Sequence, residues 1–384
     1  MTKNICTYFK NKQCESCDLL NLTYEESLNY KQSHLIHLFP ETTLNPLIAS
    51  NPVFESRNKV KLSVTGTIEM PIIGIQKPDN TYEELLNCPL HFPELNSLLN
   101  FLKPFISEFK LTPYNYKTQK GELKYIIILK PSPTPNSPLI LRFVLRSKEP
   151  LDRIKKGINK IQSFSPKTEV ISVNIQPENK AILEGHEEIV LTQKDFIFTK
   201  LDQIELLIKP KSFFQTNTDM AIKLYHYVSH KIKNLKAQNC LDLYCGIGAF
   251  SFFIANSIQS CIAVEITKEA VDSAYQASLK NKTTNIEFIC EDVDLFLKKI
   301  IHGNLAQSFD TIIVNPPRRG LTLSVIQSLL ILKPKNIVYS SCNYETFYEN
   351  YLKLKDNYTL QEIQPFDMFP FTKHLEMVAT FTLK

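Results

Sequence analysis

The pattern of apolar and polar positions divides the chain into two stretches of different character. Between residues 40 and 210, short β-like runs are separated by Pro, Asn and Gly, as in residues 131–138, which hold four prolines. This pattern predicts an antiparallel sheet with helices near residues 92–109 and 151–164. The predicted strands include 59–66, 124–130, 139–146, 170–176 and 203–209.

From about residue 212 the pattern changes to alternating strands and helices. A helix is predicted from residue 216 or 217 to about 235, because an N-capping side chain precedes apolar positions spaced three and four residues apart. Short apolar strands separated by helices are typical of a parallel, doubly wound α/β sheet. Its predicted strands are 240–245, 260–266, 286–291, 311–316 and 336–341, followed by a closing pair at 358–367 and 375–383.

Length and composition limit the class of protein. The 384 residues are enough for two or three domains, and 43% hydrophobic with 22% charged residues is typical of a soluble globular chain. No apolar run approaches the roughly 18 residues that span a bilayer, and the first residues lack the apolar core of a secretory signal. We therefore expect a cytoplasmic protein without a membrane partner. In a reducing cytosol its nine cysteines are thiols or metal ligands rather than disulfides.

The net charge of +5 is too small to indicate a polyanionic partner by itself. Residues 101–160, however, hold 13 Lys and Arg against four acids. This basic segment is a candidate nucleic-acid surface, and a solvated lysine-rich face explains it equally well.

A glycine turn follows the first strand of the α/β region, in Asp242-Leu-Tyr-Cys-Gly-Ile-Gly248. Ser251 stands where a dinucleotide fingerprint requires a third glycine, so a pyrophosphate site is not indicated. Glu265 ends the next strand, where its carboxylate can accept hydrogen bonds from ribose hydroxyls. The combination fits S-adenosylmethionine, and an ordinary strand-to-helix turn is the alternative.

Two further motifs end later strands at the same expected edge of the sheet. Asn315-Pro-Pro-Arg318 is similar to a motif of amine methyltransferases, but arginine stands where those enzymes have an aromatic residue. Ser340-Ser-Cys-Asn343 places Cys342 just before a predicted helix, whose N-terminus favours a thiolate. A buried core cysteine is the alternative for Cys342, and it is the fate predicted for Cys240, Cys261 and Cys290.

A thiolate at this edge has a chemical use. Carbon 5 of uracil is too weakly nucleophilic to attack a sulfonium methyl group, whereas addition of a thiolate to carbon 6 makes carbon 5 reactive. A base must then remove the proton from carbon 5, and Glu376 is a candidate for that base. A solvated strand glutamate is the alternative.

Four cysteines outside the α/β region are spaced like metal ligands. Cys6, Cys14 and Cys17 form C-x7-C-x2-C, and Cys88 precedes a proline. The spacing permits zinc or an iron–sulfur cluster, and unliganded thiols are the alternative.

Taken in order, these motifs resemble those of the RNA uracil-5-methyltransferase family. The resemblance rests on Ser212-Phe-Phe-Gln-Thr-Asn217, the glycine turn, Asn315-Pro-Pro-Arg-Arg-Gly320, Ser340-Ser-Cys-Asn343 and residues 366–376. It implies that Cys342 is the nucleophile, that Glu376 is the proton-abstracting base, and that four residues bind S-adenosylmethionine. Those four are Gln215, Tyr244, Glu265 and Asn315. The chain departs from the family in having Tyr244 for a usual phenylalanine, Asn315 for a frequent aspartate and Phe371 for a frequent histidine.

Residues 54–61, 111–115, 121–125 and 141–146, with the N-terminal cysteines, resemble the branch that modifies 23S ribosomal RNA. The resemblance implies that Cys6, Cys14, Cys17 and Cys88 hold a [4Fe-4S] cluster. It further implies an iron–sulfur segment with the start of the β-rich region in residues 1–90, a basic α+β RNA-contacting domain in 91–210 and a Rossmann-like methyltransferase domain in 211–384.

We expect no N-terminal OB-like barrel of the kind found in other members, so the middle domain would hold the RNA. Arg57, Lys59 and the basic segment would contact phosphates. The expected partner is 23S ribosomal RNA rather than DNA, and the expected state is a monomer.

Four alternatives stay open at this point. One is methylation of another ribosomal or transfer RNA uridine. Another is cytosine-5 methylation, although Pro317-Arg318 lacks the second cysteine usual in that class, and amine methylation is disfavoured by Arg318. The last is an RNA-binding protein without catalytic activity.

Overall fold

The computed structural model describes residues 6–77, 79–179, 184–303 and 308–384. They form two compact units. Unit 1 comprises residues 1–17, 52–199 and 208–218, and unit 2 comprises residues 18–51, 200–207 and 219–384. The predicted division at residues 90 and 210 stays a prediction. No helix in the described part is long and apolar enough to cross a membrane.

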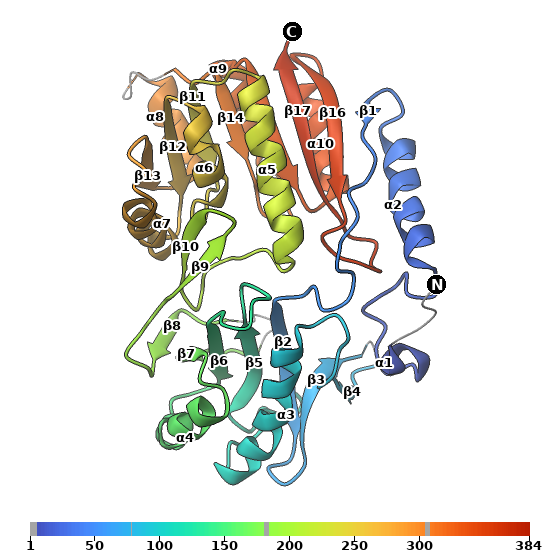
Figure 1. Cartoon of the computed structure of the whole chain (residues 1–384), viewed down its shortest axis with the longest axis vertical. Helices are drawn as coiled ribbons and strands as arrows, with labels where there is room; N and C mark the ends of the chain where they lie inside the picture. The colour runs from blue at the N-terminus through green and yellow to red at the C-terminus, as the bar shows by residue number, and fades with distance from the viewer. Residues whose placement is uncertain (1–5, 78, 180–183, 304–307) are drawn as a thin grey trace. The chain divides into compact units, whose positions relative to one another are not determined.

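Unit 1 is built on a seven-stranded sheet of order β4-β3-β2-β5-β6-β7-β8 (Figure 1). Apolar side chains of α3 and α4 pack with one face of this sheet to form the core. The elements are α1 (Thr7–Lys10), β2 (Lys59–Gly66), β3 (Pro71–Gln76), β4 (Tyr82–Glu84), α3 (Pro93–Glu108), β5 (Leu123–Leu129), β6 (Leu139–Leu145), α4 (Leu151–Phe164), β7 (Thr168–Ile175) and β8 (Glu187–Val190).

The strand predictions for this region are confirmed within about two residues, but the sheet is not wholly antiparallel. β6 and β7 run parallel, with Phe143 opposite Val173. The reason is the connection between them. The 14-residue helix α4 returns the chain to the end of the sheet at which β6 begins, so β7 runs in the same direction as β6. The sheet is therefore mixed.

Strand β2 shows how the two faces of this sheet differ. Val60, Leu62 and Val64 are buried in the core with α3, whereas Lys59 and Lys61 are only partly buried. Because successive side chains of a strand point to opposite faces, the lysines lie on the face away from the core helices.

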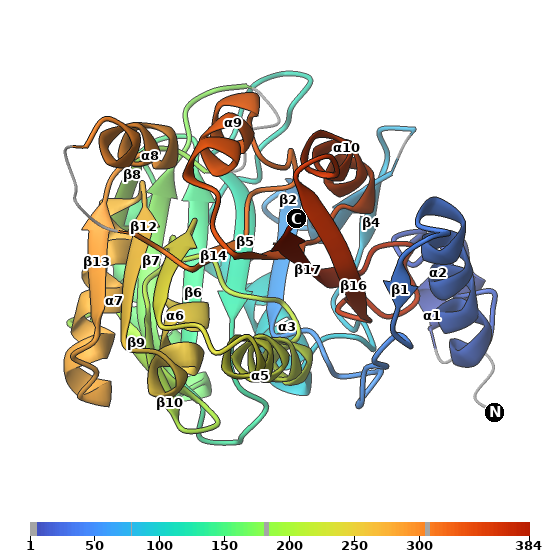
Figure 2. The ribbon, with the colours of Figure 1, turned by 90° about the horizontal axis from the view of Figure 1, so that it is seen from above.

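Unit 2 holds an eight-stranded sheet of order β1-β16-β17-β15-β14-β11-β12-β13. The five adjacent strands β15, β14, β11, β12 and β13 are parallel, as predicted, and β17 is antiparallel to both β15 and β16. Figure 2 shows α8, α9 and α10 on one face and α5, α6 and α7 on the other, so the unit is a three-layer α/β sandwich.

The bounds in this unit are α2 (Tyr24–Leu38), β1 (Thr43–Leu44), α5 (Thr218–Asn234), β11 (Asn239–Leu243), α6 (Ala249–Ile254), β12 (Ser260–Glu265), α7 (Lys268–Asn281), β13 (Ile286–Cys290), α8 (Val293–Ile301), β14 (Thr311–Val314), α9 (Leu323–Leu332), β15 (Asn336–Ser341), α10 (Tyr344–Leu354), β16 (Tyr358–Phe366) and β17 (Glu376–Leu383). A short 3-10 turn, η1 (Ala255–Ser257), follows α6. The hairpin of β9 (Ile197–Leu201) and β10 (Ile204–Ile208) has residues in both units.

Helix α2 was not expected from the sequence. Thr23 and Glu26 form a capping box at its start. Further along the helix, Lys31 makes a fully buried ion pair with Asp367, and its ammonium group also donates to the carbonyl of Phe369 at 2.9 Å. The hydroxyl of Tyr24 donates to the second oxygen of Asp367 at 2.6 Å. These bonds attach α2 to the loop between β16 and β17.

Replacing Lys31 by methionine is expected to lower the free energy of unfolding by about 3–5 kcal/mol, because it leaves Asp367 buried without its cation. The matched control is Lys298→Met, an exposed lysine of α8, with a change of roughly 0.5 kcal/mol or less. Urea denaturation of the two variants measures both. Equal stability of the two variants would show that the buried pair does not hold the loop.

Candidate active site

Most of the predicted site residues lie at one edge of the unit 2 sheet. β11, β12, β14 and β15 are parallel, so their carboxyl ends meet at this edge, and the antiparallel β17 begins there. The residues at or next to these strand ends are Tyr244, Glu265, Asn315, Cys342 and Glu376.

The glycine turn after β11 has a left-handed backbone. Tyr244, Gly246 and Gly248 have φ angles of 63°, 56° and 81°. A Cβ on Gly248 would come within 2.8 Å of the ring of Phe288, so both φ and packing require glycine there. A Cβ on Gly246 would meet no described atom within 4 Å, which leaves the backbone open to a ligand.

Glu265 holds this turn in place. One carboxylate oxygen accepts a hydrogen bond from the N–H of Gly246 at 3.2 Å, and the other accepts from the N–H of Thr267 at 2.9 Å. Each oxygen retains a lone pair, so the carboxylate can also accept from ribose hydroxyls. The open backbone and this acceptor fit the adenosine part of S-adenosylmethionine.

Ser251 has a role that the sequence did not reveal. Its hydroxyl donates to one oxygen of the fully buried Asp242 at 2.5 Å. Burial raises the pKa of Asp242 to about 7, although the hydrogen bonds from Ser251 oppose that rise. The residue in the third glycine position therefore supports the acid that begins the motif.

The loop after β14 is anchored to α10. Asn315 continues the pairing of β14 with β11, and its N–H donates to the carbonyl of Leu243 at 3.3 Å. The buried Asn350 accepts at 2.8 Å from both the N–H of Leu321 and the hydroxyl of Tyr339. Gly320 lies against this amide, since a Cβ there would be 2.7 Å from the Asn350 oxygen.

The thiol and the carboxylate of the predicted pair are neighbours. β15 and β17 pair with Ser341 opposite Met377, and extending that register by one residue places Cys342 opposite Glu376. The hydroxyl of Ser340 donates to Glu376 at 2.8 Å. Glu376 is buried, and burial raises its pKa to about 7. This carboxyl group can therefore change its protonation state near neutral pH.

Cys342 lies between opposing charges. Burial, followed by the charge of Glu376, raises the pKa of its thiol, while the charge and hydrogen bond of Arg318 lower it. Next to it, Asn343 caps α10 and donates to the backbone carbonyl of Arg318 at 3.2 Å. Sequence reasoning treated Arg318 only as a missing aromatic residue and did not identify its contact with the thiol.

The remaining predictions have mixed outcomes. Gln215 lies in unit 1, where the buried Asn58 donates to its carbonyl at 2.7 Å, and its role with the cofactor stays a prediction. Cys240 and Cys261 are buried as predicted, but Cys290 is exposed. That prediction was wrong because β13 is an edge strand of the sheet.

The four N-terminal cysteines all belong to unit 1. Burial, with smaller contributions from the charges of Cys88, Cys14 and Cys6, raises the pKa of Cys17 to about 12, so these three thiols lie within electrostatic range of Cys17. Their number and chemistry fit an iron–sulfur cluster. Among the described residues, however, no group of three or more His, Cys, Asp or Glu is arranged as a ready metal site.

Arg57 lies beside these cysteines. Its charge lowers the pKa values of Cys17 and Cys88, and its backbone forms an isolated bridge with His91. Its position gives Arg57 a second role besides the predicted phosphate contact, that of a counter-charge for thiolates.

The basic segment is largely neutralised within the protein. Eight of its 13 basic side chains form ion pairs: Lys103, Lys130, Arg142, Arg146, Lys148, Arg153, Lys155 and Lys160. In the described part of the chain, Lys110, Lys117, Lys120 and Lys156 have no such partner, and Lys124 donates to backbone carbonyls. The net charge of residues 101–160 is therefore larger than the positive charge that this segment can offer to a polyanion.

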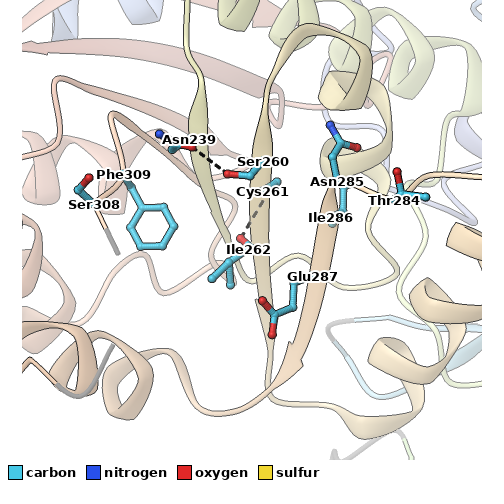
Figure 3. Close-up of a pocket in the computed structure, with 10 residues that line it drawn as sticks. All are labelled: Asn239, Ser260, Cys261, Ile262, Thr284, Asn285, Ile286, Glu287, Ser308 and Phe309. Atoms are coloured by element: carbon cyan, nitrogen blue, oxygen red, sulfur yellow. Dashed lines mark hydrogen bonds between the residues drawn. The ribbon is translucent and has the colours of Figure 1, made fainter. Parts of the chain in front are cut away.

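A pocket of about 420 Å³ lies at the opposite edge of the unit 2 sheet (Figure 3). It is lined by residues at the starts of β12 and β13, and the hydroxyl of Ser260 donates there to Asn239 at 2.8 Å. None of the predicted site residues lines it, so it is separate from the candidate active site.

Known proteins share both the sequence and the fold. The family model for tRNA (uracil-5-)-methyltransferase matches residues 186–382. The 23S rRNA (uracil(747)-C(5))-methyltransferase RlmC of Proteus mirabilis is 37% identical over 385 residues, covering 99% of each chain. The protein of the same name from Glaesserella parasuis is 36% identical over 390 residues, covering 99% of this chain and 98% of its own.

Among solved structures, the tRNA (uracil-54, C5)-methyltransferase of Pyrococcus abyssi, in complex with S-adenosyl-L-homocysteine, is 27% identical. It has a TM-score of 0.79 and covers 96% of this chain and 86% of its own. With its glycine turn and its thiol–carboxylate pair at one sheet edge, the chain belongs to the S-adenosylmethionine-dependent RNA uracil-5-methyltransferase family.

Proposed function

We propose that the protein methylates carbon 5 of a uridine in 23S ribosomal RNA. The observation that carries the proposal is the placement of Cys342 opposite Glu376, at the edge that also bears the glycine turn. The choice of RNA is supported by the names of the full-length relatives, which act on uracil 747 of 23S ribosomal RNA.

In the proposed reaction, the thiolate of Cys342 adds to carbon 6 of the uracil, and the electron pair released to carbon 5 forms a bond to the methyl group. When bound, S-adenosylmethionine would supply that methyl group, and its sulfonium–methyl bond would break to leave S-adenosylhomocysteine. Glu376 then removes the proton from carbon 5, and the resulting electron pair expels the thiolate and restores the ring double bond. The base must leave its stack for the thiol to reach the ring face.

Arg318 is proposed to favour the thiolate form of Cys342. Burial and the neighbouring carboxylate oppose ionisation of the thiol, and the guanidinium is the group that works against both. When Glu376 is neutral, its charge no longer raises the pKa of the thiol, and of these two effects only burial still opposes ionisation. Thiol and carboxyl group therefore titrate as a coupled pair.

Cofactor binding is assigned to the glycine turn and its neighbours. Glu265 would accept hydrogen bonds from the ribose, and Tyr244 and Asn315 would contact the cofactor from the ends of adjacent strands. Gln215 would complete the set. Support comes from the open space at Gly246 and from the two hydrogen bonds that fix Glu265.

The first test is release of tritium from 23S ribosomal RNA labelled at uracil carbon 5. Wild-type protein with S-adenosylmethionine is expected to release it, and Cys342→Ala is expected to lose at least about 10³-fold in rate, since covalent activation of the ring is abolished. Cys290→Ala, which alters an exposed cysteine, should behave like wild type. Release by Cys342→Ala would exclude this thiol as the nucleophile.

The second test separates the base from the nucleophile. Glu376→Gln should still form the covalent RNA adduct through Cys342 but should not resolve it, so a protein–RNA band should accumulate on a denaturing gel. In the wild type, a pKa of about 7 means that Glu376 is protonated at lower pH and cannot accept a proton. Turnover should therefore fall as the pH drops below about 7. Normal turnover by Glu376→Gln would contradict this role.

We also propose that Cys6, Cys14, Cys17 and Cys88 hold a [4Fe-4S] cluster. Support comes from the electrostatic coupling of the four thiols and from Arg57, whose charge lowers the pKa values of Cys17 and Cys88. The hydroxyl of Tyr8 accepts from the N–H of Asn87 at 3.1 Å, which ties the first cysteine segment to Cys88. The proposed role of the cluster is structural or in positioning the RNA.

Anaerobically purified protein should contain about four iron and four sulfide per chain, with the broad visible absorbance of a cluster. Cys17→Ser should lose most of both, whereas Cys290→Ser should keep them, because Cys290 is exposed and lies in the other unit. One zinc per chain, or no metal at all in protein prepared without oxygen, would contradict the cluster.

A further inference from the structure

A second pocket lies in unit 1, at one end of its seven-stranded sheet, and nothing above assigns it a role. Its volume is about 460 Å³, within the range of small-ligand sites. Its walls come from β2, β3, β4 and the turn before β5. The lining residues are Thr65, Gln76, Asn80, Tyr82, Asn115, Tyr116 and Lys117. They lie outside residues 186–382, the part matched by the family model.

Two tyrosines give the pocket aromatic walls. The hydroxyl of Tyr116 donates to that of Tyr125 at 2.6 Å, and its ring makes an edge contact with Tyr114, with centroids 4.9 Å apart. The phenol of Tyr82 is close enough to interact electrostatically with that of Tyr116. Tyr116 is thus held in position while remaining only partly buried.

The amide side chains leave both donors and an acceptor available. Gln76 donates to Asn80 at 3.0 Å, and the oxygen of Asn115 accepts from the N–H groups of Lys117 and Thr118 at 3.0 Å. Within the described residues, the Gln76 oxygen and the side-chain NH2 groups of Asn80 and Asn115 have no protein partner. Such a set matches the donors and acceptors on the edge of a nucleobase.

Charge favours the same kind of ligand. Lys117 is exposed, and in the part of the chain described it forms no ion pair, unlike most of the basic segment. No carboxylate lines the pocket. Lys61 lies on the same face of β2 as Thr65, roughly 13 Å away, because side chains four residues apart on a strand share a face. A single strand that leaves the pocket along β2 would reach that second cation.

We infer that this pocket binds one unpaired nucleotide of the RNA substrate, distinct from the methylated uridine. The base stacks on Tyr82 and Tyr116, the amides contact its edge, and Lys117 contacts its phosphate. Partly exposed aromatic rings with amides and a lysine are typical of single-strand RNA recognition. The inference rests on the proposed function for the identity of the RNA, and it makes this pocket a determinant of which RNA is chosen.

Full-length protein and unmodified 23S ribosomal RNA test the inference. Tyr116→Ala and Tyr82→Ala should each raise the RNA Kd and the KM for methylation about tenfold, the effect of losing one stacked base. The kcat at saturating RNA and the Kd for S-adenosylmethionine should not change. Lys117→Ala should lower the salt dependence of RNA binding by about one unit of slope. The matched control is Lys167→Ala, an exposed lysine of unit 1 that lies outside the basic segment and forms no ion pair within the described residues.

Tyr116→Phe separates stacking from folding, because it removes only the hydrogen bond to Tyr125. It should bind RNA nearly as wild type. If it lost as much affinity as Tyr116→Ala, the hydrogen bond and not the base contact would matter, and the inference would be overturned. Wild-type Kd and KM in both alanine variants, with unchanged thermal melting, would overturn it as well.

Photocrosslinking distinguishes failure here from failure of the proposed function. RNA carrying 4-thiouridine should crosslink to the peptide around Tyr116 whether or not methylation occurs. Crosslinks at that peptide without release of tritium would retain the pocket and reject the proposed reaction. Release of tritium with crosslinks only at other peptides would retain the proposed reaction and reject the pocket as a nucleotide site.

Discussion

β17 runs antiparallel to β15 next to an otherwise parallel set of strands, and this pairing determines where Cys342 and Glu376 of the candidate active site lie. A parallel strand in its place would enter from the opposite edge and bring its first residue far from Cys342. The antiparallel direction instead makes the first residue of β17 a neighbour of the residue that follows β15. Because register along a ladder is fixed by both buried faces, a slip of one residue would turn Glu376 to the other face.

The edge where these strands meet holds buried acids whose charge is suppressed. Asp242 and Glu376 each have a pKa raised to about 7 by burial, and each accepts a hydrogen bond from a serine hydroxyl, Ser251 and Ser340. An ionised Glu376 in this buried setting opposes formation of the Cys342 thiolate. Each serine hydroxyl donates to one oxygen of its acid, whereas the other oxygen of Asp242 is buried and has no hydrogen-bond partner among the described residues.

The regular spacing of apolar residues allowed most of the strands and helices to be predicted from the sequence. β15 was predicted to the residue, because its apolar run is bounded by polar residues on both sides. Helix α2 was missed because its buried residues include Ser27 and Lys31, so no apolar stripe marks it. The direction of β7 was missed although a 14-residue helix precedes it. The contact of Arg318 with the thiol depends on loop geometry that no spacing reveals.

The buried pair of Lys31 and Asp367 joins residues 336 positions apart. During synthesis, α2 leaves the ribosome long before the strands it packs against exist, while the sheet of unit 1 is drawn from the continuous stretch 52–199. Domains form as their residues emerge. Unit 1 can therefore be complete while Lys31 is still solvated. The loop that pairs with α2 is complete only when Asp367 has been made, so unit 1 can form before the candidate active site of unit 2 is assembled.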